Sequence, residues 1–215
     1  MGAVPRKSNN RHYYKLYQGI IVQEFSQKPE VKEGVELKQR VVEKTGKTKY
    51  YIETGGLSGR LLSCKVESTD FGDFLTLELG DSDGTYVLSI PTESRYFRDF
   101  MMRSPNIDVN KDVIINSYSF ENKEGKRVQG VKITQDDTSV ERFYTKDHPN
   151  GLPEMVQKRK GKELIWDSTD QVNFLYDQVS VFAKRLDLFT TDTPKNTKED
   201  SLSSKDEDTF DDLPF

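Results

Sequence analysis

Short runs of alternating apolar and polar residues, separated by turn sequences, dominate residues 35–90. In one such run, Leu75, Leu77 and Leu79 alternate with polar residues. A period of two places apolar side chains on one face of a strand and polar side chains on the other. The sequence therefore predicts a meander of short antiparallel strands, each with one buried face.

The predicted strands continue on both sides of this meander. They cover residues 13–25, 35–42, 50–53, 61–68, 74–79, 86–90, 112–120 and 128–134, with a weaker one at 140–144. Gly19 stands in the middle of the first run. Because a glycine permits a bulge or a sharp bend, we expect residues 13–25 to form the long first strand of a small, strongly curved barrel.

Two segments have the spacing of a helix with one buried face. Phe97, Phe100 and Met101 predict a helix over residues 92–103, which Ser104-Pro105-Asn106 ends. Ser168 and Gln171 are spaced as a capping box and predict the start of a longer helix. Its apolar stripe indicates packing on the body of the protein.

The strands with one inserted helix predict a mainly β fold, a five-stranded OB-like antiparallel barrel with an extra hairpin and a long C-terminal helix. Another small barrel or a sandwich would show the same alternation. We expect a mobile basic arm at 1–11, one OB-like domain at 12–189 with its helix at about 168–188, and a disordered acidic tail at 190–215.

The charge is unevenly distributed along the chain. The formal net charge is −4, but residues 190–215 contain eight acidic side chains and three lysines. The rest of the chain has 29 basic and 28 acidic side chains and is close to neutral. A near-neutral body is compatible with a local basic groove, since nucleic-acid binding depends on the field along the backbone path and not on the sum of charges.

Several aromatic residues lie within two positions of a cation. Tyr13 and Tyr17 flank Lys15, and Trp166 follows a basic cluster. Flat aromatic faces for bases beside cations for phosphates are the parts that a single-strand binding groove needs. The candidate single-stranded DNA-binding residues are Tyr13, Lys15, Tyr17, Lys38, Arg40, Lys47, Lys49, Tyr50, Tyr51, Lys65, Lys158, Arg159, Lys160, Lys162 and Trp166.

The motifs that could support catalysis are incomplete. Gly46-Lys47-Thr48 has the last letters of a phosphate-binding loop, but Val41 stands where the first glycine belongs. His12 and His148 lack a neighbouring metal-ligand pattern. We therefore expect no enzymatic activity, no cofactor and no metal. A nuclease built on converging carboxylates and metal ions remains an alternative.

The sequence ends in Asp211-Asp212-Leu213-Pro214-Phe215. This segment resembles the tail tip of bacterial single-stranded DNA-binding proteins, which end Asp-Asp-Ile-Pro-Phe or close to it, and Leu213 replaces the isoleucine. In that family the tip docks on replication, recombination and repair proteins. The resemblance implies that these five residues bind partner proteins.

A second segment resembles tailed-phage single-stranded DNA-binding proteins, which join an OB barrel to an acidic tail. It comprises Asn116-Ser117-Tyr118-Ser119-Phe120, Lys123-Glu124-Gly125-Lys126 and Gly130. The chain lacks a long Gly/Gln-rich linker and a match to the short N-terminal domain of the bacterial family. The resemblance implies a phage-type monomer or homodimer in the cytoplasm of a bacterium or a phage-infected cell. The single cysteine also favours an intracellular location.

These features together predict a sequence-independent single-stranded DNA-binding protein of replication, recombination or repair. Its tail would recruit a polymerase, helicase, primase or nuclease. The main alternative is a β-barrel adaptor that recruits such enzymes without binding DNA itself. We expect no membrane partner, because no stretch approaches the roughly 18 to 20 apolar residues of a membrane span.

Overall fold

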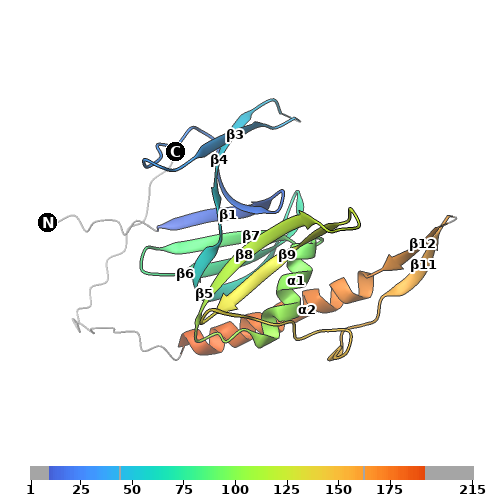
Figure 1. Cartoon of the computed structure of the whole chain (residues 1–215). Coiled ribbons are helices and arrows are strands. Elements are labelled where there is room, and N and C mark those ends of the chain that lie inside the picture. The colour runs from blue at the N-terminus through green and yellow to red at the C-terminus, as the bar shows by residue number, and fades with distance from the viewer. Residues whose placement is uncertain (1–9, 44, 162, 192–215) are drawn as a thin grey trace, which may run out of the picture.

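A computed structural model describes residues 10–43, 45–161 and 163–191, which fold into one large sheet, one small sheet and two α-helices (Figure 1). The main sheet has the strand order β10-β9-β8-β5-β6-β7-β1-β2-β4-β3, with β10 and β3 at its edges. The mainly β class is therefore confirmed, but the described strands form one large open sheet and not the predicted closed five-stranded barrel. None of the helices in these ranges is both long and apolar enough to cross a lipid bilayer. The elements are β1 (Arg11–Tyr17), β2 (Ile20–Phe25), β3 (Leu37–Val41), β4 (Thr48–Thr54), β5 (Leu57–Thr69), β6 (Gly72–Gly80), β7 (Thr85–Pro91), α1 (Arg95–Arg103), the 3-10 turn η1 (Ser104–Asn106), β8 (Asp112–Glu121), β9 (Arg127–Gln135), β10 (Thr138–Ser139), β11 (Val156–Lys160), β12 (Glu163–Asp167) and α2 (Thr169–Thr191).

The centre of the fold is the meander β5-β6-β7, followed by α1 and the hairpin β8-β9. The start of β5 pairs with β8, and the remainder pairs with β6. Gly59 lies at this change of partner with φ +149°, and a Cβ there would lie 2.8 Å from the Gly80 carbonyl oxygen. The register then shifts between Leu61 and Ser63. These features let one strand serve both halves of a strongly bent sheet.

The expectation of one long strand over residues 13–25 was wrong. This segment is a hairpin in which β1 pairs antiparallel with β2. The turn residues Gln18 and Gly19 have φ values of 51° and 92°. Two successive positive φ angles match the twist of a tight hairpin turn, so Gly19 reverses the chain where we expected it to bend a strand. The long bent strand is β5.

The hairpin β1-β2 extends the main sheet beyond the meander. β1 pairs parallel with β7, and β2 pairs antiparallel with β4, which pairs in turn with β3. The turn of this hairpin reaches β8, where the Ser117 hydroxyl donates to the Gly19 carbonyl at 2.8 Å. The first four strands therefore form a curved addition that pairs with β7 and also contacts β8 through the hairpin turn.

Both helices lie on the same side of the main sheet, and the hydrophobic core lies between them and the sheet (Figure 1). The predicted α1 is confirmed: Ser94 caps it by accepting a hydrogen bond from the Phe97 amide, and Phe97, Phe100 and Met101 are buried. The predicted packing of the C-terminal helix on the body is also confirmed. α2 buries Leu175, Val179, Phe182 and Leu186.

Two local expectations differ from the structure. Ser168 and Gln171 do not form the expected reciprocal pair, because the Ser168 hydroxyl accepts from Arg98 and the Gln171 amide donates to the Pro153 carbonyl. Asp167 caps the start of α2 by accepting from the Thr169 amide at 2.9 Å. Residues 140–144 are not a strand. Lys158, Arg159 and Lys160 of the basic cluster are on β11, and the hairpin β11-β12 projects away from the main sheet (Figure 1).

Candidate nucleic-acid interface

One face of the main sheet gathers most of the candidate residues from the N-terminal half of the chain. The pairs Lys15–Val22, Glu24–Tyr51 and Lys38–Tyr51 fix which side chains share a face, because directly opposed residues point the same way. We call this side of β1-β2-β4-β3 the polar face. It carries Tyr13, Lys15, Tyr17, Glu24, Lys38, Arg40, Lys49, Tyr51 and Glu53.

The polar face is curled inward. The guanidinium carbon of Arg40 lies 4.5 Å from the centre of the Tyr17 ring, although β2 and β4 separate their two strands. Three strand spacings in a flat sheet span about 14 Å. Tyr17 also contacts Tyr51 edge to face, with ring centres 5.7 Å apart. The curl therefore produces a concave surface with tyrosine rings and cations inside it.

Glu24 organises the cations of this surface. Its carboxylate pairs with Lys15 on β1 at 2.7 Å, Lys49 on β4 at 2.7 Å and Arg40 on β3 at 2.8 Å. Burial acts to raise the pKa of Glu24, but the hydrogen bonds from the three cations outweigh it and lower the pKa to about 2. Glu24 is therefore ionised at neutral pH, and three strands are tied together through one side chain.

The polar face carries a small excess of positive charge. The cations Lys15, Lys38, Arg40 and Lys49 face the carboxylates of Glu24 and Glu53, with Glu36 at the edge 4.0 Å from Lys38. The Lys38–Glu53 pair is partly exposed, and pairs of this kind are weak, so a phosphate can replace that carboxylate at little cost, whereas Glu24 is 12% exposed and stays in place. Tyr13 is 62% exposed on the same face and offers a free aromatic surface.

The polar face continues onto β7, β6 and β5. The pairs Lys15–Ser89, Ser89–Thr76 and Thr76–Lys65 place Lys65 on the same side of the sheet. Lys65 pairs there with Glu67 at 2.8 Å. The candidate residue on β5 thus lies on the same side of the sheet as those on β1 to β4, but it is three strands away from β1, and the intervening Thr76 is buried.

Other candidate residues lie elsewhere. Tyr50 is paired with Phe25 and Gln39 and points to the opposite face of the sheet, while Lys47 lies in the turn between β3 and β4. Lys158, Arg159 and Lys160 are on β11 and Trp166 is on β12. Lys162 and the segment Asp211, Asp212, Leu213, Pro214 and Phe215 lie outside the described residues.

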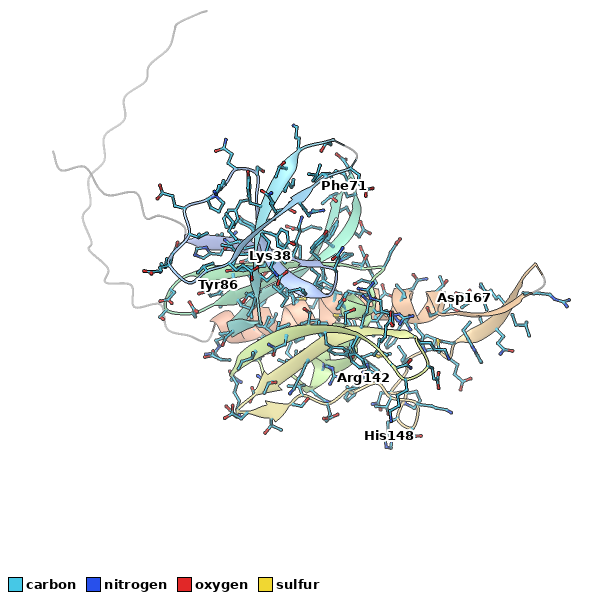
Figure 2. All side chains as sticks on the ribbon, turned by 45° about the horizontal axis from the view of Figure 1, so that its top comes forward. Lys38, Phe71, Tyr86, Arg142, His148 and Asp167 are labelled. Carbon is cyan, nitrogen blue, oxygen red and sulfur yellow. The ribbon has the colours of Figure 1, made fainter. Side chains whose placement is uncertain are left out.

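The hairpin β11-β12 is a second surface with cations and an aromatic ring. Trp166 is 62% exposed, and Lys158 pairs with Asp167. The hairpin forms its own two-stranded sheet, distinct from the main sheet, and Figure 2 shows Lys38 and Asp167 well apart. The sequence clusters at 13–51 and 158–166 therefore do not form one groove.

The structure also shows residues that sequence reasoning missed. Phe71 is 91% exposed in the turn between β5 and β6. The turn sequence Asp70-Phe71-Gly72-Asp73 could have predicted this exposed ring, because a phenylalanine in a tight turn is not on the buried face of a strand. One cavity is lined by three arginines, Arg95 and Arg98 of α1 together with Arg142, which is far from the other two in sequence.

Comparisons with protein-family models, with curated proteins and with solved structures found no match. Within residues 10–43, 45–161 and 163–191, no three His, Cys, Asp or Glu side chains are grouped so that they could hold a metal ion.

Proposed function

We propose that this protein binds single-stranded DNA without sequence preference and that the polar face is the binding surface. The observation that carries the proposal is the curl of β1-β2-β4-β3, which brings Tyr17 into edge-to-face contact with Tyr51 and under the guanidinium group of Arg40. Aromatic rings next to cations accept bases and phosphates of any sequence. The tail tip Asp211–Phe215 would recruit proteins of replication, recombination or repair.

The arrangement of the central strands supports an OB-type origin for the fold. The unit β5-β6-β7-α1-β8-β9 has five strands with a helix after the third, and its long first strand pairs with both the second and the fourth. OB-folds bind oligonucleotides on the face of their second and third strands. In this chain those strands are β6 and β7, and their Ser89 and Thr76 are on the same side of the sheet as the polar face.

The proposal is tested by fluorescence anisotropy with labelled oligo-dT, a mixed-sequence single strand and the matching duplex. We expect binding to both single strands, weaker binding to the duplex and a steep loss of affinity with salt, since phosphate contacts release counterions. Equal affinity for duplex, or no binding at low salt, would overturn the proposal. Loss of binding with retained capture of replication enzymes would favour the adaptor hypothesis, and magnesium-dependent cleavage of the probe would favour a nuclease.

Matched variants locate the surface. Lys15→Gln combined with Lys49→Gln should weaken binding. It should also make the plot of the logarithm of the binding constant against the logarithm of salt concentration less steep by about 2, because each lysine is expected to contact one phosphate. Lys111→Gln combined with Lys184→Gln removes two exposed lysines from the loop before β8 and from α2, neither of which belongs to β1-β2-β4-β3, and should leave the slope unchanged. Tyr13→Ala should cost about 1 to 3 kcal/mol of binding free energy if a base stacks there.

A further inference from the structure

A cleft lies between α1, residues 142–155 and the start of α2, away from the polar face. Two adjoining cavities form it, of about 310 Å³ and 650 Å³, and both are lined by Arg98, Met102 and Arg142. Figure 2 shows Arg142 well apart from Lys38 of the polar face. The larger volume lies in the range of protein sites that hold a small molecule or a short peptide segment.

The smaller cavity is rich in arginine. Arg95, Arg98 and Met102 follow one side of α1 at helical spacing, and Arg142 approaches from the loop after β10. Arg98 donates only to neutral partners in the described hydrogen bonds, Ser168 Oγ at 3.2 Å and Gln171 Oε1 at 3.3 Å. Burial lowers the pKa of Arg98, and the charges of Arg95 and Arg142 lower it further. The guanidinium groups therefore face one another across the cavity.

Carboxylates near the cleft do not balance these charges. Asp99 is buried and accepts from Arg142 Nε at 2.8 Å, and it also pairs with Arg103 at 3.4 Å. Among the lining residues the other carboxylate is the exposed Glu154 at the larger cavity. The guanidinium groups of Arg98 and Arg95 therefore have no carboxylate partner among the lining residues and are available to bind an anionic group of a ligand.

The larger cavity is mainly apolar. Its lining includes Met102, Tyr144, Leu152, Met155 and Trp166. Met155 is 43% exposed and Trp166 is 62% exposed. An apolar pocket beside unbalanced guanidinium groups is complementary to a segment that carries carboxylates next to large apolar side chains.

The chain contains such a segment, in which Asp211 and Asp212 precede Leu213, Pro214 and Phe215. We propose that this cleft docks residues 211–215 of the chain itself, with the two aspartates at Arg98 and Arg95 and with Phe215 in the apolar cavity beside Trp166. A nucleic-acid phosphate would satisfy the arginines alone, whereas this segment also fills the apolar cavity. The inference does not depend on DNA binding at the polar face.

The length of the chain after α2 permits this docking. The cleft lies at the start of α2, and the 23 residues of that helix span about 34 Å. A coil of the length of residues 192–215 has a root-mean-square reach of about 25 to 30 Å and a fully extended reach of about 80 Å. The tip can therefore return along the helix to the cleft of its own chain or enter that of a second copy.

Trp166 is a local reporter because it is the one tryptophan of the sequence. In the full-length protein, docking should shield Trp166 from acrylamide and shift its emission to shorter wavelength. Both effects should be lost in a Phe215→Ala variant and, separately, in a variant that combines Asp211→Asn with Asp212→Asn. Neither variant changes a residue of the folded domain. Dependence of the signal on protein concentration distinguishes docking between copies from docking within one chain. Unchanged emission and quenching in both tail variants would contradict the proposal.

A labelled peptide of residues 206–215 gives a direct binding test on the full-length Phe215→Ala protein. Arg98→Gln should weaken peptide binding by about tenfold, as expected for the loss of one charge-assisted contact. Lys146 is an exposed cation at the larger cavity, and Lys146→Gln should weaken peptide binding less than Arg98→Gln does. Because an exposed lysine can be replaced without disturbing the fold, this second variant tests the cleft even if Arg98→Gln fails to fold. Lys111→Gln, in the exposed loop before β8 and outside both the cleft and the polar face, is the control and should have no effect. If oligo-dT shields Trp166 and the peptide does not bind, the cleft is a nucleic-acid site and the proposal fails.

Discussion

Arg40 of β3 lies over the ring of Tyr17 of β1, with 4.5 Å between the guanidinium carbon and the ring centre. The same guanidinium group pairs with Glu24 at 2.8 Å. One side chain thus connects an edge strand, an aromatic ring three strands away and the carboxylate between them. This contact defines the concave shape of the polar face.

Arg40→Met tests that role, because it keeps much of the side-chain length and removes the charge. We expect oligo-dT affinity to fall by about 1 to 3 kcal/mol, through loss of both a phosphate partner and the cation over Tyr17. Anisotropy titration measures the loss. Arg159→Met on the separate hairpin β11-β12 is the matched control for the polar face. An equal loss in both variants would indicate that the hairpin shares in binding.

Glu24→Gln should lower the stability of the fold. The pKa of Glu24 is about 2 in the folded state, below its value of about 4.3 in an unfolded chain. The stabilising contribution is therefore present above about pH 5 and is lost as the pH falls toward 2. We expect the variant to be about 1 to 3 kcal/mol less stable at pH 7, with a smaller difference at pH 3. Urea unfolding at the two pH values, with the exposed Glu36→Gln as control, measures this.

The same Glu24→Gln variant should bind oligo-dT more tightly at neutral pH, although it is less stable. The substitution removes a negative charge from a surface where Lys15, Arg40 and Lys49 would otherwise meet phosphates. Affinity that falls together with stability would show that Glu24 mainly orders the three cations.

Deletion of residues 190–215 should tighten single-strand binding, most clearly at low salt. This segment carries eight acidic side chains and three lysines. We expect it to compete with DNA for the cations of the polar face, at the high effective concentration of a tethered segment. Removal of Phe215 alone should leave DNA affinity nearly unchanged while it abolishes partner recruitment. Weaker DNA binding after the full deletion would mean that the tail belongs to the DNA site.

Asp99→Asn should be strongly destabilising. The Asp99 side chain is 3% exposed, pairs with Arg103 and Arg142, and accepts from the Val131 amide at 2.9 Å. Gly130 leaves the space for it, since a Cβ there would collide with Asp99 and Tyr118. Loss of a buried charge from such a pair costs about 3 to 5 kcal/mol. Urea unfolding measures the effect, and the exposed Asp136→Asn should leave the unfolding midpoint nearly unchanged.

The sequence alone determined most of the strands and both helices. Alternation at residues 74–79 and the spacing of Phe97, Phe100 and Met101 depend on local geometry, and β6 and α1 form where these patterns predict them. Gly19 was misassigned because a glycine within a β-rich run permits either a bend or a reversal. The choice depends on whether β1 pairs with β2, which the local sequence does not specify.

Only the tertiary structure decided which candidate residues share a surface. Tyr13, Lys15, Tyr17, Lys38, Arg40, Lys49 and Tyr51 meet because the strand register and the curl of the sheet bring them together. Tyr50 is adjacent to Tyr51 in sequence but points to the other face, and Trp166 lies on a separate hairpin. Arg142 joins Arg95 and Arg98 through a long loop. Periodicity reports which face of an element is buried, whereas the relative placement of faces is set by long-range pairing and packing.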